Sequence, residues 1–81
     1  MYNDIDIKKT ILSTAAGRGA EKSTCPSEIA RTLFPVGWRR HMKRIVELAI
    51  ELQQQGKVLI TQKGKPVDIA TIRGPIRIKI S

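Results

Sequence analysis

The chain has 81 residues, 41% of them apolar, and 15 Lys and Arg against 7 Asp and Glu give a net charge of +8. A chain this short buries only about 60% of its unfolded surface, which leaves room for one modest core and excludes most large enzyme folds. The apolar content argues against intrinsic disorder. The net charge favours an acidic partner, namely nucleic acid, an anionic membrane surface or an acidic protein.

Cysteine content and hydropathy exclude further classes of protein. A single cysteine, Cys25, excludes an internal disulfide, and no Cys/His cluster is present that would bind zinc. We therefore expect no metal and no other cofactor. The amino terminus lacks a basic segment followed by an apolar one, and no stretch approaches the roughly 20 apolar residues that span a bilayer. These features predict a soluble cytoplasmic protein that does not enter membranes.

Two helices are predicted in the first half of the chain. Residues 4–17 carry apolar side chains at helical spacing, and Asn3 or Asp4 is available as the N-cap. The second helix, over 26–33, is shorter, and Pro26 suits its first position because proline lacks the N–H that would be unpaired there.

The third predicted helix, over 38–55, has the strongest periodicity in the chain. Pro35 and Gly37 precede it in a turn, because proline cannot continue the hydrogen-bond ladder of the second helix. Gly56 is the expected C-cap. The apolar stripe of this helix consists of Trp38, Met42, Ile45, Ala49 and Leu52.

Two strands are predicted after the third helix. Residues 58–62 are rich in β-branched side chains, and residues 76–80 alternate apolar with basic side chains. The connection over 63–75 is far longer than a tight hairpin needs and carries three basic residues.

The order of these elements predicts an α+β fold. Three helices followed by a two-stranded antiparallel hairpin are typical of a small winged helix-turn-helix, here a single domain over 1–81. The helix over 38–55 would be the recognition helix, and the loop over 63–75 would be the wing.

The positive charge is unevenly distributed along the chain. Residues 1–30 sum to zero, residues 31–45 hold five cations and no acid, and residues 57–81 sum to +5. The only charged residues between these two basic segments are Glu47 and Glu51. The excess therefore falls in the two elements that a winged helix presents to DNA.

On the third helix the basic side chains lie opposite the apolar stripe. Four cations occupy its first two turns, where the helix dipole disfavours positive charge. A solvated face with local ion pairs to Glu47 is the alternative interpretation. The pattern nevertheless suits a phosphate backbone or a guanine edge. The predicted DNA-binding residues are Arg39, Arg40, Lys43, Arg44, Lys63, Lys65 and Arg73.

Other chemistry finds little support in the sequence. No nucleophile, base and orienting group can be assembled, so we expect no enzyme. Trp38 is expected in the core, His41 in surface packing, and Cys25 in a structural or capping role. Three aromatic residues are too few for a platform that stacks single-stranded bases.

Two motifs stand out in the chain, Cys25-Pro26-Ser27-Glu28 at a helix start and Gly64-Lys65-Pro66-Val67-Asp68 after the first strand. Together with several other short segments, they resemble a bacterial family known only as a domain of unknown function. The CPSE helix start and the GKPVD segment are fairly specific when taken together. The resemblance implies a winged-helix-like fold and an expectation of DNA binding, but no established activity or site. Pro35-Val36-Gly37 stand where an acidic or polar cap is expected. The resembling segments are Thr24-Cys25-Pro26-Ser27-Glu28-Ile29-Ala30-Arg31, Trp38-Arg39, Gly56-Lys57, Thr61-Gln62-Lys63-Gly64-Lys65-Pro66-Val67-Asp68 and Arg73-Gly74-Pro75-Ile76-Arg77.

The sequence therefore leads to two hypotheses. The first is a transcription-associated protein that binds duplex DNA, with the third helix in the major groove and the wing on the backbone. The second is a protein-interaction module that docks an acidic partner on the same basic face, since one fold serves both uses. Glu47 and Glu51 support the second hypothesis, because they would repel DNA. The oligomeric state does not follow from the sequence.

Overall fold

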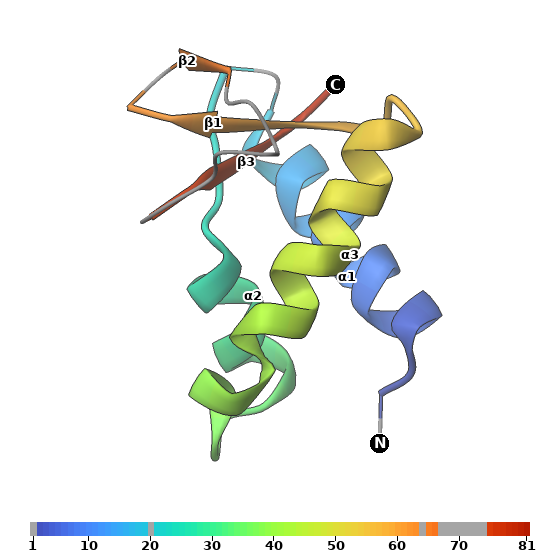
Figure 1. Ribbon diagram of the computed structural model, residues 1–81, viewed down its shortest axis with the longest axis vertical. Helices are drawn as coiled ribbons and strands as arrows, with labels where there is room; N and C mark the ends of the chain where they lie inside the picture. Colours follow the sequence, from blue (N-terminus) through green and yellow to red (C-terminus); the bar gives the residue numbers. More distant parts are fainter. Residues whose placement is uncertain (1, 20, 64, 67–74) are drawn as a thin grey trace.

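The computed structural model describes residues 2–19, 21–63, 65–66 and 75–81. Helices occupy its lower part in Figure 1, and an antiparallel sheet crosses the top. Helices followed by an antiparallel sheet confirm the predicted α+β class and are consistent with a winged helix. The elements are α1 (Asp4–Arg18), α2 (Pro26–Leu33), the 3₁₀ helix η1 (Trp38–His41), α3 (Met42–Gln54), β1 (Val58–Gln62), β2 (Lys65–Pro66) and β3 (Arg77–Ile80).

The first helix begins with a reciprocal cap. Asn3 Oδ1 accepts a hydrogen bond from the Asp6 amide at 2.8 Å, and the Asp6 carboxylate accepts one from the Asn3 amide at 3.3 Å. Two amides that the helix cannot satisfy internally are thereby paired. Within the described ranges, no helix combines the length and the apolar character needed to cross a membrane.

A hydrogen bond between side chains connects the start of α2 to the end of α1. Pro26 occupies the first turn, and Cys25 is the N-cap without a side-chain capping bond. Glu28 accepts hydrogen bonds from the Thr24 hydroxyl and from the Arg18 guanidinium. The Thr24 bond, and secondarily Arg18, hold the pKa of the Glu28 carboxyl below its ordinary value.

The predicted single helix over 38–55 is divided into two. Gly37 adopts a left-handed conformation, with φ of 77°, and no side chain caps the turn that follows it. The Arg40 amide donates to the Gly37 carbonyl at 3.1 Å, which gives the first turn its 3₁₀ character. The α-helix therefore begins only at Met42 and ends at Gln54.

The sheet has one more strand than the predicted hairpin. Its order is β2-β1-β3, with β1 antiparallel to both neighbours. The first residues of the predicted wing fold back on β1, so that Lys65 pairs with Gln62. On the other side of β3, Thr24 and Ile78 exchange two backbone hydrogen bonds, of 2.8 and 2.7 Å. The segment before α2 thus protects the outer edge of β3.

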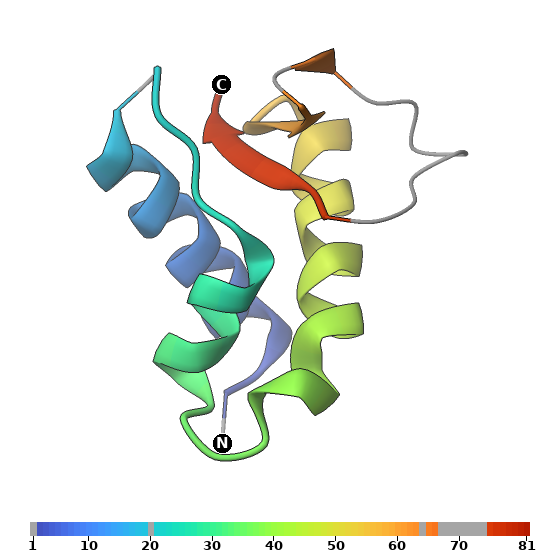
Figure 2. The same ribbon diagram turned by 90° about the vertical axis from the view of Figure 1, so that its left-hand side faces the viewer.

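The core lies between the helices and the sheet. In Figure 2, α1 and α2 lie to the left and α3 to the right, with β3 in the upper part between them. Each α-helix contributes residues at helical spacing, and β1 and the segment around β3 contribute alternate residues. The buried cluster consists of Ile7, Ile11, Ile29, Ala30, Leu33, Ile45, Leu48, Ala49, Leu52, Val58, Ile60, Ile76 and Ile78.

Candidate nucleic-acid interface

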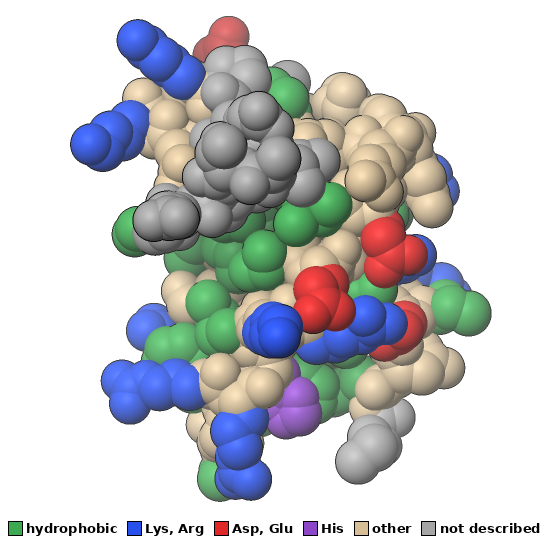
Figure 3. Space-filling view, in the orientation of Figure 1, with side chains coloured by type: hydrophobic (Ala, Val, Ile, Leu, Met, Phe, Trp, Pro, Cys, Tyr) green, Lys and Arg blue, Asp and Glu red, His purple; other side chains and the backbone are tan. Residues whose placement is uncertain are grey.

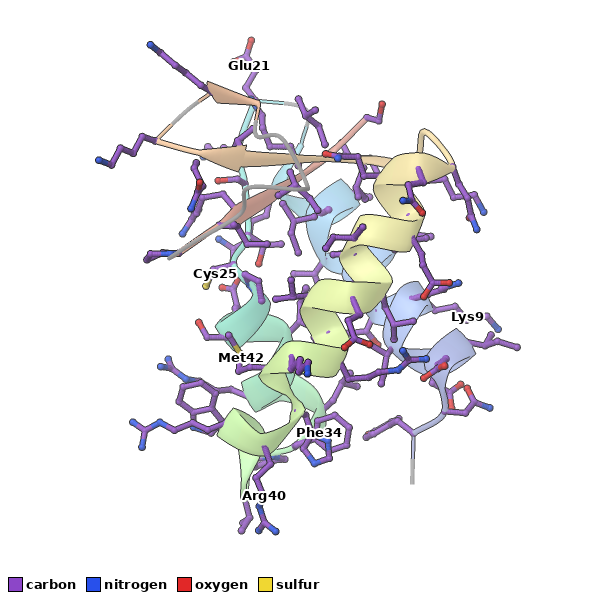
Figure 4. All side chains as sticks on the ribbon, in the orientation of Figure 1. Lys9, Glu21, Cys25, Phe34, Arg40 and Met42 are labelled. Atoms are coloured by element: carbon purple, nitrogen blue, oxygen red, sulfur yellow. The ribbon has the colours of Figure 1, made fainter. Side chains whose placement is uncertain are left out.

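The turn between α2 and η1 sets the position of the basic residues that follow. Gly37, which has a left-handed backbone, lies against the Arg40 side chain. A β-carbon at this position would lie 3.0 Å from Arg40 Nη2, so a larger residue would crowd the guanidinium. Val36 is 89% exposed at the same turn. Figure 4 places Arg40 at the lower tip of the molecule, below Met42 and Phe34. The turn therefore presents the cations of η1 at one end of the domain.

Aromatic packing fixes η1 against the end of α2. The rings of Phe34 and His41 are stacked, with centroids 3.6 Å apart and planes at 13°. Tyr2 meets Phe34 edge-on at 5.7 Å. His41 is half-buried in this stack, in line with the packing role expected for it. These contacts hold the backbone of η1 in place without using its charged side chains.

Three of the predicted DNA-binding residues lie together in η1 and at the start of α3. Arg39 and Arg40 in η1 and Lys43 in the first turn of α3 are exposed. None of the three forms an ion pair with a carboxylate of the described residues. Their charge is thus unneutralised within that part of the chain, at a helix start where the dipole disfavours it.

Arg44 stands apart from this group. Its Nε donates to Asp4 Oδ1 at 3.1 Å, its Nη2 also donates to Asp4, and its Nη1 donates to Glu47 Oε2 at 3.0 Å. The hydrogen bond from Arg44 holds the pKa of the Asp4 carboxyl below its ordinary value, and the two carboxylates raise the pKa of Arg44. The guanidinium of Arg44, one of the predicted DNA-binding residues, therefore connects α3 to α1.

Both acids of α3 have a basic partner, Glu47 within α3 and Glu51 on α1. Glu47 pairs with Arg44, and Glu51 Oε1 lies 3.4 Å from Lys8 Nζ. The pairs are exposed, so each adds little stability. They nevertheless determine the distribution of charge, because each negative side chain of α3 has a positive neighbour.

The predicted wing is described only in part. Lys63, which adopts a positive φ of 51°, and Lys65 are exposed at the turn from β1 to β2. Neither pairs with a described carboxylate. Arg73 lies outside the described residues. Nearby on β3, Arg77 donates to the Ser23 hydroxyl at 2.8 Å and to the Ser23 carbonyl at 3.0 Å, so part of its donor set is used within the fold.

Arg31, which is not among the predicted DNA-binding residues, lies beside this group of cations. The side chain is exposed on α2, and its Cζ lies 4.6 Å from the centroid of the Trp38 ring. Arg39 Cζ lies 5.1 Å from the same centroid. Trp38, expected in the core, is half-buried and packs against the core edge. The available indication was the place of Arg31 in the acid-free segment over 31–45.

On one face of the molecule, the ion-paired side chains and the unpaired basic side chains lie in different regions. In Figure 3, basic side chains project along the left and lower edges, while acidic side chains near the centre right lie beside basic ones. The turn after β1 and η1 lie toward opposite ends of the long axis, which measures 32 Å (Figure 1).

Cys25 has a local partner. Its Sγ lies 3.1 Å from Ser27 Oγ. Burial raises the pKa of the thiol, but hydrogen bonds with the Ser27 hydroxyl and the Glu28 amide outweigh it and lower the pKa. Among the residues that the structure describes, no group of three or more His, Cys, Asp and Glu side chains is placed to hold a metal ion.

Comparison with known protein families shows where the chain belongs. The family described as "Protein of unknown function (DUF3253)" matches residues 4–81, which covers every helix and strand described above. No curated protein matches the chain.

Proposed function

The chain belongs to this family of proteins of unknown function, and we propose that it is a bacterial, cytoplasmic winged-helix protein that binds duplex DNA. In this proposal the amino-terminal end of the recognition helix enters the major groove, and the turn after β1 contacts the backbone. The proposed function involves neither catalysis nor a cofactor.

One observation carries the proposal: the acids of α3 are paired, and the cations at its start are not. Arg39, Arg40 and Lys43 have no carboxylate partner among the described residues, whereas Glu47 and Glu51 each have a basic one. A fold selected only for stability would place acids at this helix start. A bound polyanion would supply negative charge at this helix start. Duplex DNA is the polyanion we propose, because its phosphates carry one negative charge about every 1.7 Å along the helix axis.

The roles of the cations follow from their positions. In helix-turn-helix proteins, the first residues of the recognition helix reach base edges, and neighbouring residues contact phosphates. Arg40 and Lys43 occupy the first set of positions, Arg39 beside them contacts a phosphate, and Lys63 and Lys65 contact phosphates from the sheet. Arg44 orients the recognition helix through Asp4 and does not contact DNA.

An acidic protein partner is the competing function. Its sequence support was the pair of glutamates on α3, which were expected to repel DNA. Glu51 is ion-paired with Lys8, and Glu47 shares Arg44 with Asp4, so the negative charge of α3 is partly offset and the expected repulsion is reduced. We therefore propose DNA as the partner, and the following experiment separates the two functions.

Addition of duplex DNA to the ¹⁵N-labelled protein is expected to shift the backbone amide resonances of residues 37–43, together with those of Arg31, Lys63 and Lys65. These residues carry or adjoin the unpaired cations. Resonances of α1 between Ile7 and Ala15 are expected to stay in place and serve as the internal control. Absence of shifts at a DNA concentration well above that of the protein, or shifts confined to α1 and the first turn of α2, would contradict the DNA proposal and leave an acidic protein as the candidate partner.

A further inference from the structure

We propose that Arg31, Trp38 and Arg39 form a clamp for the phosphate backbone of duplex DNA, in which the indole positions the two guanidinium groups. This inference rests on the proposed function and adds to it a contact from α2, the first helix of the helix-turn-helix. It also gives the half-buried Trp38 a role beyond packing.

The geometry brings two cations to one ring. Arg31 Cζ and Arg39 Cζ lie 4.6 and 5.1 Å from the Trp38 centroid, and the two side chains come from different elements. They therefore lie no more than about 10 Å apart, roughly one Debye length at 0.1 M salt, so their repulsion is not fully screened. No carboxylate of the described residues pairs with either one.

The indole offsets this repulsion without neutralising the charge. A ring face attracts a guanidinium through its quadrupole, yet the cation keeps its full charge for a ligand. Trp38 itself is held by the core, since it packs against the buried cluster. Both arginines are thus held near one place before a ligand arrives, which lowers the conformational entropy lost on binding.

Phosphate is the anion that this arrangement suits. A guanidinium presents a planar fork of N–H donors that matches phosphate oxygens. Phosphates of one DNA strand follow one another every 3.4 Å or so along the helix axis, so two guanidinium groups within about 10 Å can contact neighbouring phosphates. The first helix of a helix-turn-helix crosses the DNA backbone, which is where Arg31 on α2 would lie. Because two arginines already lie over the half-buried Trp38 ring, we assign the indole a positioning role and not the stacking of bases.

The test compares R31Q with the wild type and with K9Q in titrations of a fluorescein-labelled duplex. Lys9 is an exposed cation of α1 on the far side of the molecule from Cys25 and Met42 (Figure 4), so K9Q removes one charge elsewhere. Loss of one phosphate contact is expected to weaken binding by about 8-fold at 0.1 M salt and to reduce the slope of log K against log [salt] by about 0.9. K9Q is expected to change the affinity less than 2-fold.

The W38F variant tests the positioning role. It keeps both arginines but offers a weaker ring, so the salt slope is expected to stay near that of the wild type while the affinity falls about 2- to 4-fold. Trp38 is the only tryptophan, so its fluorescence reports directly on the clamp. Duplex DNA is expected to change that emission in the wild type and in K9Q, and less in R31Q.

The outcomes separate the clamp from the wider proposal. If the wild type binds DNA and R31Q behaves as K9Q does, the clamp is wrong and the DNA-binding proposal stands. If the wild type fails to bind, both are wrong. If poly-glutamate changes Trp38 emission as strongly as duplex DNA at equal charge, the phosphate assignment is overturned. Should W38F not fold, R31Q alone decides the question.

Discussion

Replacement of Arg39, Arg40 and Lys43 together by glutamine is expected to weaken the binding of duplex DNA by about 100- to 500-fold at 0.1 M salt. Each phosphate contact releases counterions and contributes a factor of about 8 at this salt concentration. The three side chains are exposed and unpaired among the described residues, so their loss leaves no buried group unsatisfied and the fold intact. Fluorescence anisotropy of a labelled duplex measures the effect.

A matched triple variant shows whether position or net charge matters. Lys9, Lys22 and Lys57 are also exposed and form no ion pair with a described carboxylate, and their replacement by glutamine removes the same charge. The control variant is expected to lose less than about 5-fold in affinity, since these lysines lie away from η1. Equal losses in the two variants would mean that binding depends on net charge alone, and the proposed interface would be wrong.

The replacement of Ile60 by alanine is expected to lower the free energy of unfolding by about 2–5 kcal/mol. Ile60 is 0% exposed in β1 and belongs to the buried cluster, so the shorter side chain leaves a cavity between sheet and helices. A domain of this size is stable by roughly 4–12 kcal/mol, so the loss is a large part of the total. Thermal unfolding followed by circular dichroism is expected to show a Tm at least about 10 °C lower.

The adjacent strand residue provides the control. Leu59 points to the other face of the sheet and is 36% exposed. The L59A variant is expected to cost less than about 1.5 kcal/mol, because little apolar surface leaves a buried environment. Equal destabilisation by the two substitutions would contradict the assignment of the sheet faces.

The sequence predicted those elements whose determinants are local. Asn3 and Pro26 mark helix starts that hydrogen bonding and proline geometry dictate within a few residues. Apolar and basic residues alternate around Ile78, and successive strand side chains point to opposite faces. This pattern correctly predicted that Ile76 and Ile78 face the core. Local patterns of this kind were enough for the fold class.

The division of the third helix was harder to foresee. Its apolar stripe begins at Trp38, so periodicity alone extended the α-helix to that residue. The 3₁₀ turn instead depends on the backbone of Gly37, whose φ of 77° no side-chain pattern specifies. Pairing of Thr24 with Ile78 is equally invisible, since it joins residues far apart in the chain.

Membership of the candidate site depended on tertiary neighbours. Arg44 has the same local features as Lys43, but folding brings it to Asp4, 40 positions earlier in the chain. Arg31 lay on a different helix from the expected site and meets Arg39 only at the Trp38 ring. Charge segregation along the sequence therefore located the basic region but could not tell which of its cations are paired.

The most direct test of DNA binding is a titration of a labelled duplex with the wild-type protein between 50 and 200 mM salt. Six exposed cations without a described carboxylate partner are assigned to phosphates or base edges, namely Arg31, Arg39, Arg40, Lys43, Lys63 and Lys65. If all six neutralise phosphates, the slope of log K against log [salt] is expected to be about −5, and the affinity should fall about 10³-fold over this range. An affinity that is undetectable at 50 mM salt, or a slope near zero, would contradict the account.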